Sequence, residues 1–191
     1  MDGTVGAVRV IGGSSRGRRL KARLPAGVRP TSDRVREAIF DILGSMGGVE
    51  GATVIDLFCG SGAMGAEALS RGADHVTFVD HDDSSLAAVA ANLDAVGLSE
   101  RSATLVRAEL PGWLRRAPRV DLALCDPPYD FDGWESLLGS LHAGVAVLES
   151  AAQMELPDRW VTTRTRRYGG TLVTVARENS APGAAPAATS P

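Results

Sequence analysis

The sequence predicts an α/β fold in which a mostly parallel β-sheet carries helices on both faces. From Ala52 onward, short apolar stretches typical of buried strands alternate with stretches of helical periodicity. Such alternation indicates βαβ units, which place parallel strands side by side beneath crossover helices. Two further strand-like stretches flank Tyr168-Gly169-Gly170 and predict an antiparallel hairpin that closes the sheet.

The boundaries of these elements follow from the apolar pattern. We expect strands near 53–58, 75–80, 102–107, 119–125 and 145–149, and helices near 63–71, 83–97, 109–116 and 132–142. The closing hairpin should run over 160–167 and 171–177.

Ahead of the sheet, the sequence predicts a β-hairpin followed by a helix. Stretches 7–11 and 18–23 flank a glycine- and serine-rich turn, which predicts a hairpin with a mobile tip. Thr31, Ser32 or Asp33 should cap a helix from 34 to about 46. Its apolar face is predicted to consist of Val35, Ile39, Ile42 and Leu43.

These patterns divide the chain into four parts. We expect a flexible N-terminus over 1–7, a basic hairpin extension over 8–30 and the main domain over 31–177. The tail, 178–191, is rich in alanine and proline and is expected to be disordered.

Length and composition fit one globular protein of the cytoplasm. The 191 residues, 44% of them hydrophobic, suffice for a single domain with a sizeable core. No uninterrupted apolar stretch approaches the roughly 18 residues of a membrane span. Two cysteines and three scattered histidines predict neither a disulfide scaffold nor a metal site. We therefore expect a reduced, cytoplasmic protein that holds no metal, does not bind a membrane and acts as a monomer.

The charge is distributed very unevenly along the chain. The net charge is −3, yet the stretch from Val8 to Arg36 has nine basic residues and one acid, Asp33. Such a basic segment on an acidic domain predicts a surface that binds nucleic acid; a solvated hairpin with no partner is the alternative. The candidate RNA contacts are Arg9, Arg16, Arg18, Arg19, Lys21, Arg23, Arg29, Thr31, Arg34 and Arg36.

A glycine-rich turn follows the first strand of the sheet. Gly60 and Gly62 let the backbone approach a ligand at the N-terminus of the next helix. Asp80 ends the second strand 20 residues after Gly60, where an acid can bind the hydroxyls of a ribose. The same spacing of the glycines and the acid is also typical of proteins that bind NAD. Asp56, four residues before Gly60, favours S-adenosylmethionine (SAM), because SAM carries an ammonium group and NAD does not.

Other candidate cofactor contacts lie next to these strand ends. Phe58 and Cys59 belong to the glycine turn itself. Ala108 and Glu109 follow the third strand, where Glu109 or the Ala108 backbone would contact the adenine; Glu109 could equally favour a helix start through the helix dipole. His81 either lines the adenosine or is an ordinary surface histidine.

The motif Asp126-Pro127-Pro128-Tyr129 follows the apolar strand 120–125. Two prolines cannot continue a central strand, so the chain must turn at its carboxyl end. The Asp126 carboxylate and the Pro127 carbonyl can accept the two hydrogens of an amino group on a flat ring, and Tyr129 can stack on that ring. The strand ends that carry this motif and the glycine turn should be neighbours at one edge of the sheet.

Together these motifs resemble the RsmD family of bacterial methyltransferases. The similarity covers about 8–177 and includes Arg9-Val10-Ile11-Gly12-Gly13, Arg29-Pro30-Thr31-Ser32-Asp33-Arg34-Val35-Arg36-Glu37 and the two motifs above. The resemblance implies a Rossmann-like SAM-dependent methyltransferase fold with seven strands in the order 3-2-1-4-5-7-6. It also implies methylation of the N2 amine of a guanine (conventionally numbered 966) in small-subunit 16S ribosomal RNA, as naked RNA or in an assembling 30S particle.

Two other functions are compatible with parts of the sequence. An adenine-N6 methyltransferase acting on DNA or RNA would use the same tetrapeptide, because both targets present an amino group on a planar ring. A non-catalytic RNA-binding assembly factor would need the basic segment alone.

Overall fold

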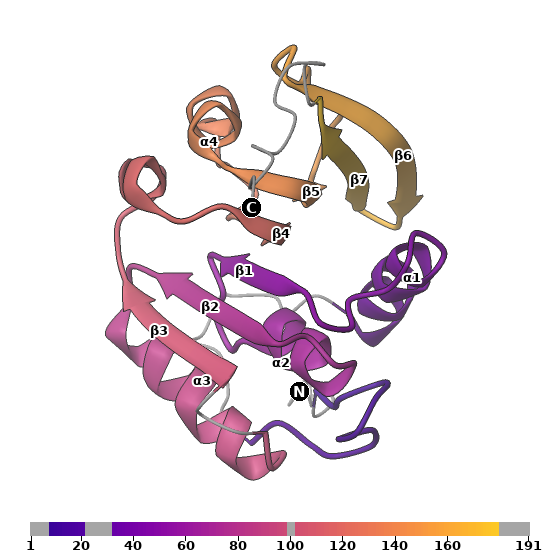
Figure 1. Ribbon diagram of the computed structural model, residues 1–191, viewed down its shortest axis with the longest axis vertical. Coiled ribbons are helices and arrows are strands. Elements are labelled where there is room, and N and C mark those ends of the chain that lie inside the picture. Colours follow the sequence, from indigo (N-terminus) through magenta and orange to yellow (C-terminus); the bar gives the residue numbers. More distant parts are fainter. Residues whose placement is uncertain (1–7, 22–31, 99–101, 180–191) are drawn as a thin grey trace, which may run out of the picture.

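The computed structural model describes residues 8–21, 32–98 and 102–179, and these build a seven-stranded sheet with helices on both faces (Figure 1). The strand order is β3-β2-β1-β4-β5-β7-β6, which confirms the expected order. The strands are β1 (Thr53–Leu57), β2 (His75–Asp80), β3 (Ala103–Arg107), β4 (Val120–Cys125), β5 (Ala143–Ser150), β6 (Trp160–Tyr168) and β7 (Thr171–Glu178).

The pairing of the strands gathers several strand ends at one edge of the sheet. Strands β1 to β5 are parallel, so their carboxyl ends lie together at what we call the carboxyl edge. Strand β7 is antiparallel to both β5 and β6. Because two antiparallel steps restore the original direction, β6 also ends at the carboxyl edge.

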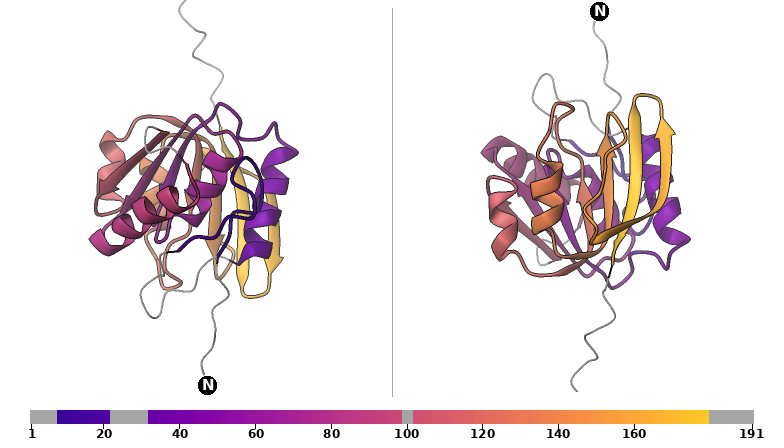
Figure 2. Two further views of the ribbon diagram at one scale, coloured as in Figure 1. Left: turned by 90° about the horizontal axis from the view of Figure 1, so that it is seen from below. Right: turned by 90° about the horizontal axis from the view of Figure 1, so that it is seen from above.

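Three α-helices cover one face of the sheet, namely α1 (Asp33–Gly44), α2 (Ala63–Ser70) and α3 (Asp83–Ala95). The other face is covered by the 3₁₀ helix η2 (Gly112–Arg116) and by α4 (Trp134–Ser140), as Figure 2 shows. Alternate side chains of the buried strands therefore enter two separate hydrophobic clusters, as the period-2 geometry of strands requires.

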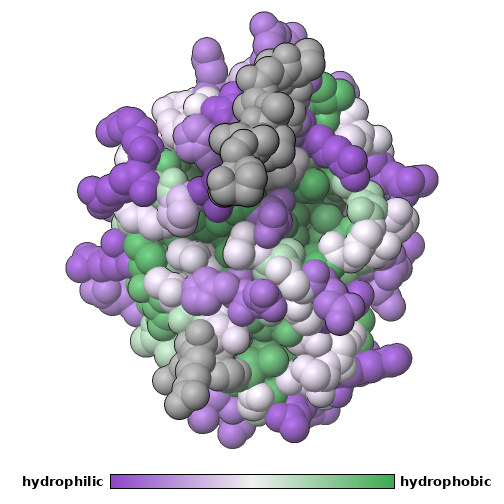
Figure 3. Space-filling view, in the orientation of Figure 1, coloured by the Kyte–Doolittle hydropathy of each residue, from purple (hydrophilic) through white to green (hydrophobic). Residues whose placement is uncertain are grey.

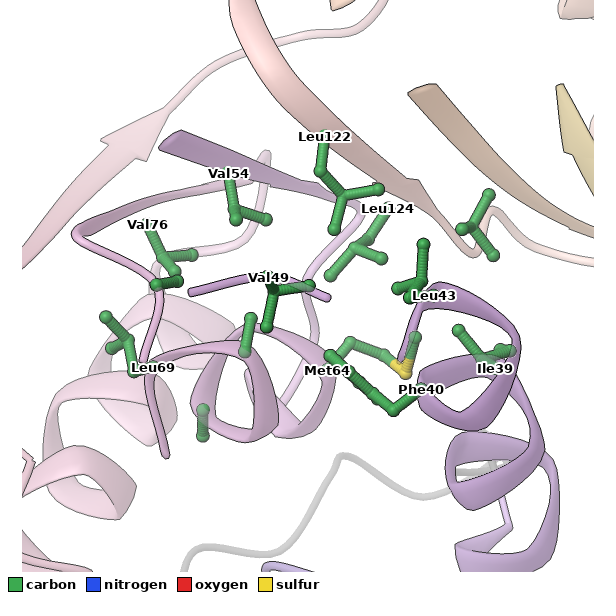
Figure 4. Close-up of a cluster of buried hydrophobic side chains, with 14 of the residues drawn as sticks. Ile39, Phe40, Leu43, Val49, Val54, Met64, Leu69, Val76, Leu122 and Leu124 are labelled. Carbon is green, nitrogen blue, oxygen red and sulfur yellow. The ribbon is translucent and has the colours of Figure 1, made fainter. Parts of the chain in front are cut away.

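The larger cluster joins α1 and α2 to the centre of the sheet (Figure 4). Ile39 and Phe40 of α1 and Met64 of α2 meet side chains of β1 and β4, such as Val54 and Leu124. Burying each such side chain stabilises the fold by about 1.5–3 kcal/mol. This packing fixes α2, and with it the turn at its N-terminus.

The helix α1 agrees with the sequence prediction. Ser32 is the N-cap, and its hydroxyl accepts a hydrogen bond from the Val35 amide at 3.3 Å. The predicted apolar face is buried, since Val35, Ile39, Ile42 and Leu43 are each at most 7% exposed.

The helix predicted at 109–116 is shorter than expected. Only Gly112–Arg116 is helical, as one 3₁₀ segment that follows Pro111 at its N-cap. Proline disfavours the helical conformation of the residue before it, here Leu110, which explains why no helix runs from 109 through Pro111. The other helices and strands predicted from residue 34 onward are present with small shifts at their ends.

The N-terminal hairpin is only partly formed, and its tip is anchored rather than mobile. Within residues 8–21, one antiparallel bridge, between Arg9 and Arg19, stands in place of the two predicted strands. The Ser14 amide donates to the Ser70 carbonyl at 2.7 Å, and the Ser15 hydroxyl donates to the Val96 carbonyl at 2.8 Å. The expected mobile tip is therefore wrong, because the turn docks on α2 and on the end of α3.

Some predictions fall outside the described residues. They concern 1–7, the tail from 180 onward, and the candidate RNA contacts Arg23, Arg29 and Thr31. In the part of the chain that is described, no helix is long and apolar enough to cross a membrane. Hydrophilic side chains stand out along the outline of the face shown in Figure 3.

Candidate active site

The glycine turn between β1 and α2 contains backbone conformations that residues other than glycine rarely adopt. Phe58, Gly60 and Gly62 all have positive φ, of 57°, 52° and 73°. A Cβ on Gly62, the N-cap of α2, would lie 2.9 Å from Val89 Cγ2. Glycine is therefore needed at Gly62 for its conformation and for its close packing.

Two buried aspartates hold this turn by hydrogen bonds. Asp56 Oδ2 accepts from the Gly65 amide at 2.9 Å, in the first turn of α2. Asp80 Oδ2 accepts from the Gly60 amide at 2.9 Å, and its Oδ1 lies 3.3 Å from His81 Nδ1. Asp56 and Asp80 are 3% and 7% exposed, whereas the His81 side chain is 67% exposed.

The electrostatics of the turn favour a cation. Burial raises the pKa of Asp56 well above its ordinary value; the Gly65 amide opposes this shift, and the charges of Asp126 and Asp80 add to it. Burial, with the charge of Asp56, also raises the pKa values of the Cys59 and Cys125 thiols, so neither behaves as a thiolate nucleophile. An ammonium group bound here would stabilise the ionised form of Asp56. The residues present thus fit the amino-acid end of SAM.

The residues predicted for the adenine end lie beside β2. The Ala108 amide donates to the Asp80 carbonyl at 2.9 Å, which joins the ends of β2 and β3. Glu109 is exposed at the same edge, and its carbonyl accepts from the Trp113 amide at 3.2 Å.

The Asp-Pro-Pro-Tyr turn adjoins the glycine turn through the register of the sheet. Leu57 of β1 pairs with Cys125 of β4, so the residues that follow, Phe58 and Asp126, leave neighbouring strands at matching positions. Asp126 is half-buried, and Tyr129 is 63% exposed with its hydroxyl 3.4 Å from Thr171 Oγ1. The two motifs therefore lie next to each other, as predicted.

A pocket of about 320 Å³, open mouth included, lies on the β5 side of this turn. Its lining consists of Asp126, Pro127, Pro128, Tyr129, Phe131, Trp134, Glu149, Ser150, Ala151 and Thr171. The Phe131 ring packs edge-on against Phe58 and Trp134, with centroids 5.2 and 5.3 Å apart. A residue of the glycine turn thus packs against a wall of this pocket.

Sequence reasoning missed six of the ten lining residues. Phe131 and Trp134 follow the proline turn closely, so their aromatic character could have indicated a ring-binding wall. Glu149 is an acid that is 5% exposed, in a strand whose preceding residues are apolar. It lies one position beyond the Cys125–Leu148 pair, and therefore next to Asp126 across the ladder. Ser150 and Thr171 gave no signal in the sequence.

Most of the described candidate RNA contacts are exposed, namely Arg9, Arg16, Arg18, Arg19, Lys21 and Arg34. Arg36 is not available to RNA, because it is 0% exposed. Its guanidinium donates to the Arg9 carbonyl at 2.6 Å and to Asp33 Oδ1 at 2.8 Å. The structure contradicts the prediction for Arg36, which instead holds the N-terminal segment against α1.

The anchor of that segment is Glu67 of α2, which the sequence did not single out. Its carboxylate accepts from the amides of Ile11 and Gly12, each at 2.7 Å, and from Arg71 Nε at 2.7 Å. Arg36 Nε lies 3.8 Å from the same carboxylate. This buried acid and the contacts of the tip with Ser70 together tie the basic segment to α2.

Comparison with known proteins gives consistent matches. The family model described as Conserved hypothetical protein 95 matches residues 8–177. The putative rRNA methyltransferase YlbH of Bacillus subtilis is 36% identical over 182 residues, covering 88% of this chain and 97% of that protein. The ribosomal RNA small subunit methyltransferase D of Haemophilus influenzae is 35% identical over 71% of each chain. Among solved structures, the putative methyltransferase yhhF of Escherichia coli has a TM-score of 0.80 at 28% identity, covering 92% of this chain and 100% of that chain.

Proposed function

The chain belongs to the RsmD family, and from this premise we propose that it transfers a methyl group from SAM to the N2 amine of a guanine in small-subunit ribosomal RNA. The similarity to proteins named as methyltransferases of small-subunit ribosomal RNA supports the reaction class and the type of substrate. We further propose that the enzyme acts in the cytoplasm as a monomer, on naked RNA or on an assembling 30S particle.

One observation carries the proposal. The glycine turn and the Asp-Pro-Pro-Tyr turn leave adjacent parallel strands at matching positions, with Leu57 opposite Cys125. A cofactor held at the first turn and a base held at the second would therefore meet at the carboxyl edge, where ligands bind in doubly wound sheets.

The residues of the glycine turn would hold SAM, which supplies an electrophilic methyl group when bound. Asp56 would stabilise its ammonium group, and Asp80 at the end of β2 would accept hydrogen bonds from the ribose hydroxyls. The positive φ of Gly60 and Gly62 exposes the backbone of the turn to the ligand.

The second turn would position the acceptor amine. The lone pair of an exocyclic amine is delocalised into the ring, which makes the nitrogen a weak nucleophile. Hydrogen bonds from the amine to the Asp126 carboxylate and the Pro127 carbonyl would favour a more tetrahedral nitrogen aimed at the methyl group. Tyr129 is exposed and could stack on the base, worth about 1–3 kcal/mol. The base must leave its helix to reach this position.

The proposal is tested with labelled SAM and unmodified small-subunit RNA, presented as naked transcript and as 30S particles. Mass spectrometry of the nucleosides should reveal N2-methylguanosine, and mapping should place it at one position. N6-methyladenosine would refute guanine as the target. Binding of RNA without binding of SAM in calorimetry would instead support a non-catalytic factor.

The role of Asp126 is tested with Asp126→Asn, which keeps the size of the side chain. Methyl transfer should fall by about 100-fold or more, since a positioned charge near the reaction is removed, while SAM affinity should change little. The matched control is Asp158→Asn, an exposed aspartate just before β6 at the opposite edge of the sheet. Full activity of the Asp126 variant would contradict the proposed role.

A further inference from the structure

Strand β6 has an unusual surface composition for the edge of a sheet. Residues 161–167 are all exposed, so both faces of the strand reach solvent. Three of them are arginines, Arg164, Arg166 and Arg167, which we call the β6 arginine row. Hydrophilic side chains project from this edge of the molecule in Figure 3, where Figure 1 places β6 beside α1.

The β6 arginine row runs up to the pocket. Arg167 pairs with Leu172 of β7, which pairs with Ser150 of β5, a residue of the pocket lining. Arg167 therefore lies two strand spacings, about 10 Å, from Ser150 along the ladder. Its Nη1 is 3.5 Å from the carbonyl of Ala151, also in the lining. Arg166 and Arg164 continue away from the pocket mouth along the same strand.

Within residues 8–21, 32–98 and 102–179, the three arginines of the row form no ion pair with an acid, whereas six other arginines do, namely Arg9, Arg36, Arg71, Arg107, Arg119 and Arg159. Arg119 and Arg159 both pair with Glu178 at the opposite edge of the sheet. Arg107 pairs with Asp83, and Arg71 pairs with Glu67. A chain of net charge −3 thus keeps uncompensated positive charge beside its pocket.

We propose that the β6 arginine row binds phosphates of the substrate RNA and forms a second RNA surface, separate from the N-terminal basic segment. The two surfaces are formed by different elements, because the N-terminal segment docks on the C-terminal ends of α2 and α3, whereas β6 is the edge strand next to β7. RNA bound along β6 would bring a base to the Asp-Pro-Pro-Tyr turn, because the row runs up to the pocket that this turn lines. This inference rests on the proposed function and extends its substrate contacts.

Arginine suits this role physically. A guanidinium binds a phosphate through two parallel hydrogen bonds, and it is weakly hydrated compared with an ammonium group. Arg166 and Arg167 are neighbours in a strand and project from its two faces. They would therefore bind phosphates of the RNA on both faces of the edge strand. Such contacts position the nucleic acid without reading its sequence.

The test is the double variant Arg166→Gln/Arg167→Gln, with Arg115→Gln/Arg116→Gln as the matched control. The control removes the same charge from two exposed arginines at the end of η2. They lie just before the start of β4, at the end of the sheet opposite the carboxyl edge. Binding of an unmodified small-subunit RNA transcript is measured at several salt concentrations, and SAM binding is measured by calorimetry.

We expect the double variant to bind RNA more weakly, with a shallower dependence of log K on log salt. The slope should decrease by about 0.7 for each phosphate that the variant no longer neutralises, hence by about 1.4 for two phosphates of single-stranded RNA. SAM affinity should be unchanged. The variant Arg166→Lys/Arg167→Lys should recover most of the slope, because it keeps both charges.

Two results would overturn the inference. One is an RNA affinity and salt slope equal to those of the control variant. The other is unchanged RNA binding together with self-association in sedimentation, which would mean that the arginines only prevent pairing between edge strands. If the wild type itself methylated no RNA, the proposed function would fail instead, so the two failures are distinguishable.

Discussion

The substitution Glu67→Gln tests how the N-terminal basic segment is attached to the main domain. Glu67 is 0% exposed and accepts hydrogen bonds from the amides of Ile11 and Gly12 and from Arg71. Its charge also faces Arg36, itself 0% exposed, at 3.8 Å. Glutamine keeps the shape of the side chain, but it replaces one acceptor oxygen with a donor and removes the negative charge.

The expected decrease in stability can be worked out from these interactions. Removing one partner of a buried ion pair costs about 3–5 kcal/mol, and a buried amide left without an acceptor costs about 1–3 kcal/mol. Asp33 also pairs with Arg36 and compensates part of the first cost. We therefore expect the free energy of unfolding to fall by about 3 kcal/mol, a large share of the 5–15 kcal/mol typical of a domain.

Urea unfolding followed by circular dichroism measures this decrease, and amide hydrogen exchange of Ile11 and Gly12 locates it. The control is Glu37→Gln, an exposed residue of α1 that should change stability by at most about 0.5 kcal/mol. A decrease below about 1 kcal/mol, with both amides still slow to exchange, would refute the reasoning.

Three other changes have predictable effects. Because burial raises the pKa of Asp56, the folded protein binds a proton where the unfolded chain has released it; without SAM, stability should fall as pH rises from about 4 through the raised pKa. In the Asp56→Asn variant, the free energy of unfolding measured with urea should differ less between about pH 5 and about pH 8 than in the wild type. An equal difference would contradict this. Gly65→Ala should destabilise by at least about 1–3 kcal/mol in thermal unfolding, since its Cβ would lie 2.2 Å from Phe78 Cε1; wild-type stability would show that the helix shifts freely. Gly13→Ala should release the docked tip and speed tryptic cleavage after Arg16, because its Cβ would lie 1.7 Å from the Ser70 carbonyl oxygen; equal cleavage rates would argue against docking.

The sheet and its two motif turns could be predicted because each depends on local chemistry. Buried parallel strands appear as short apolar stretches. Gly60 and Gly62 permit a positive φ, whereas Pro127 fixes φ and cannot donate a backbone hydrogen bond. The strand order itself came from the resemblance to a family. The register that sets Leu57 opposite Cys125 agrees with the expected neighbourhood of the two turns.

The errors concern contacts between residues that are far apart in the sequence. The tip at Gly13 looks mobile because nothing near it indicates the docking site at Ser70. Arg36 looks like one more basic residue, although its partner Glu67 is 31 positions away within a mostly apolar helix. Glu149 was overlooked for the same reason, since only the pairing of β4 with β5 places it next to Asp126.

The length of helix α2 fixes the distance and the rotation between the glycine turn and the docked N-terminal segment. Its N-terminal end at Gly62 forms the glycine turn, and its C-terminal turn, at Glu67 and Ser70, carries the docked segment. One residue inserted between these ends would rotate them by about 100° relative to each other and lengthen the helix by about 1.5 Å. Homologous chains should therefore vary in the side chains of this helix far more readily than in its number of residues.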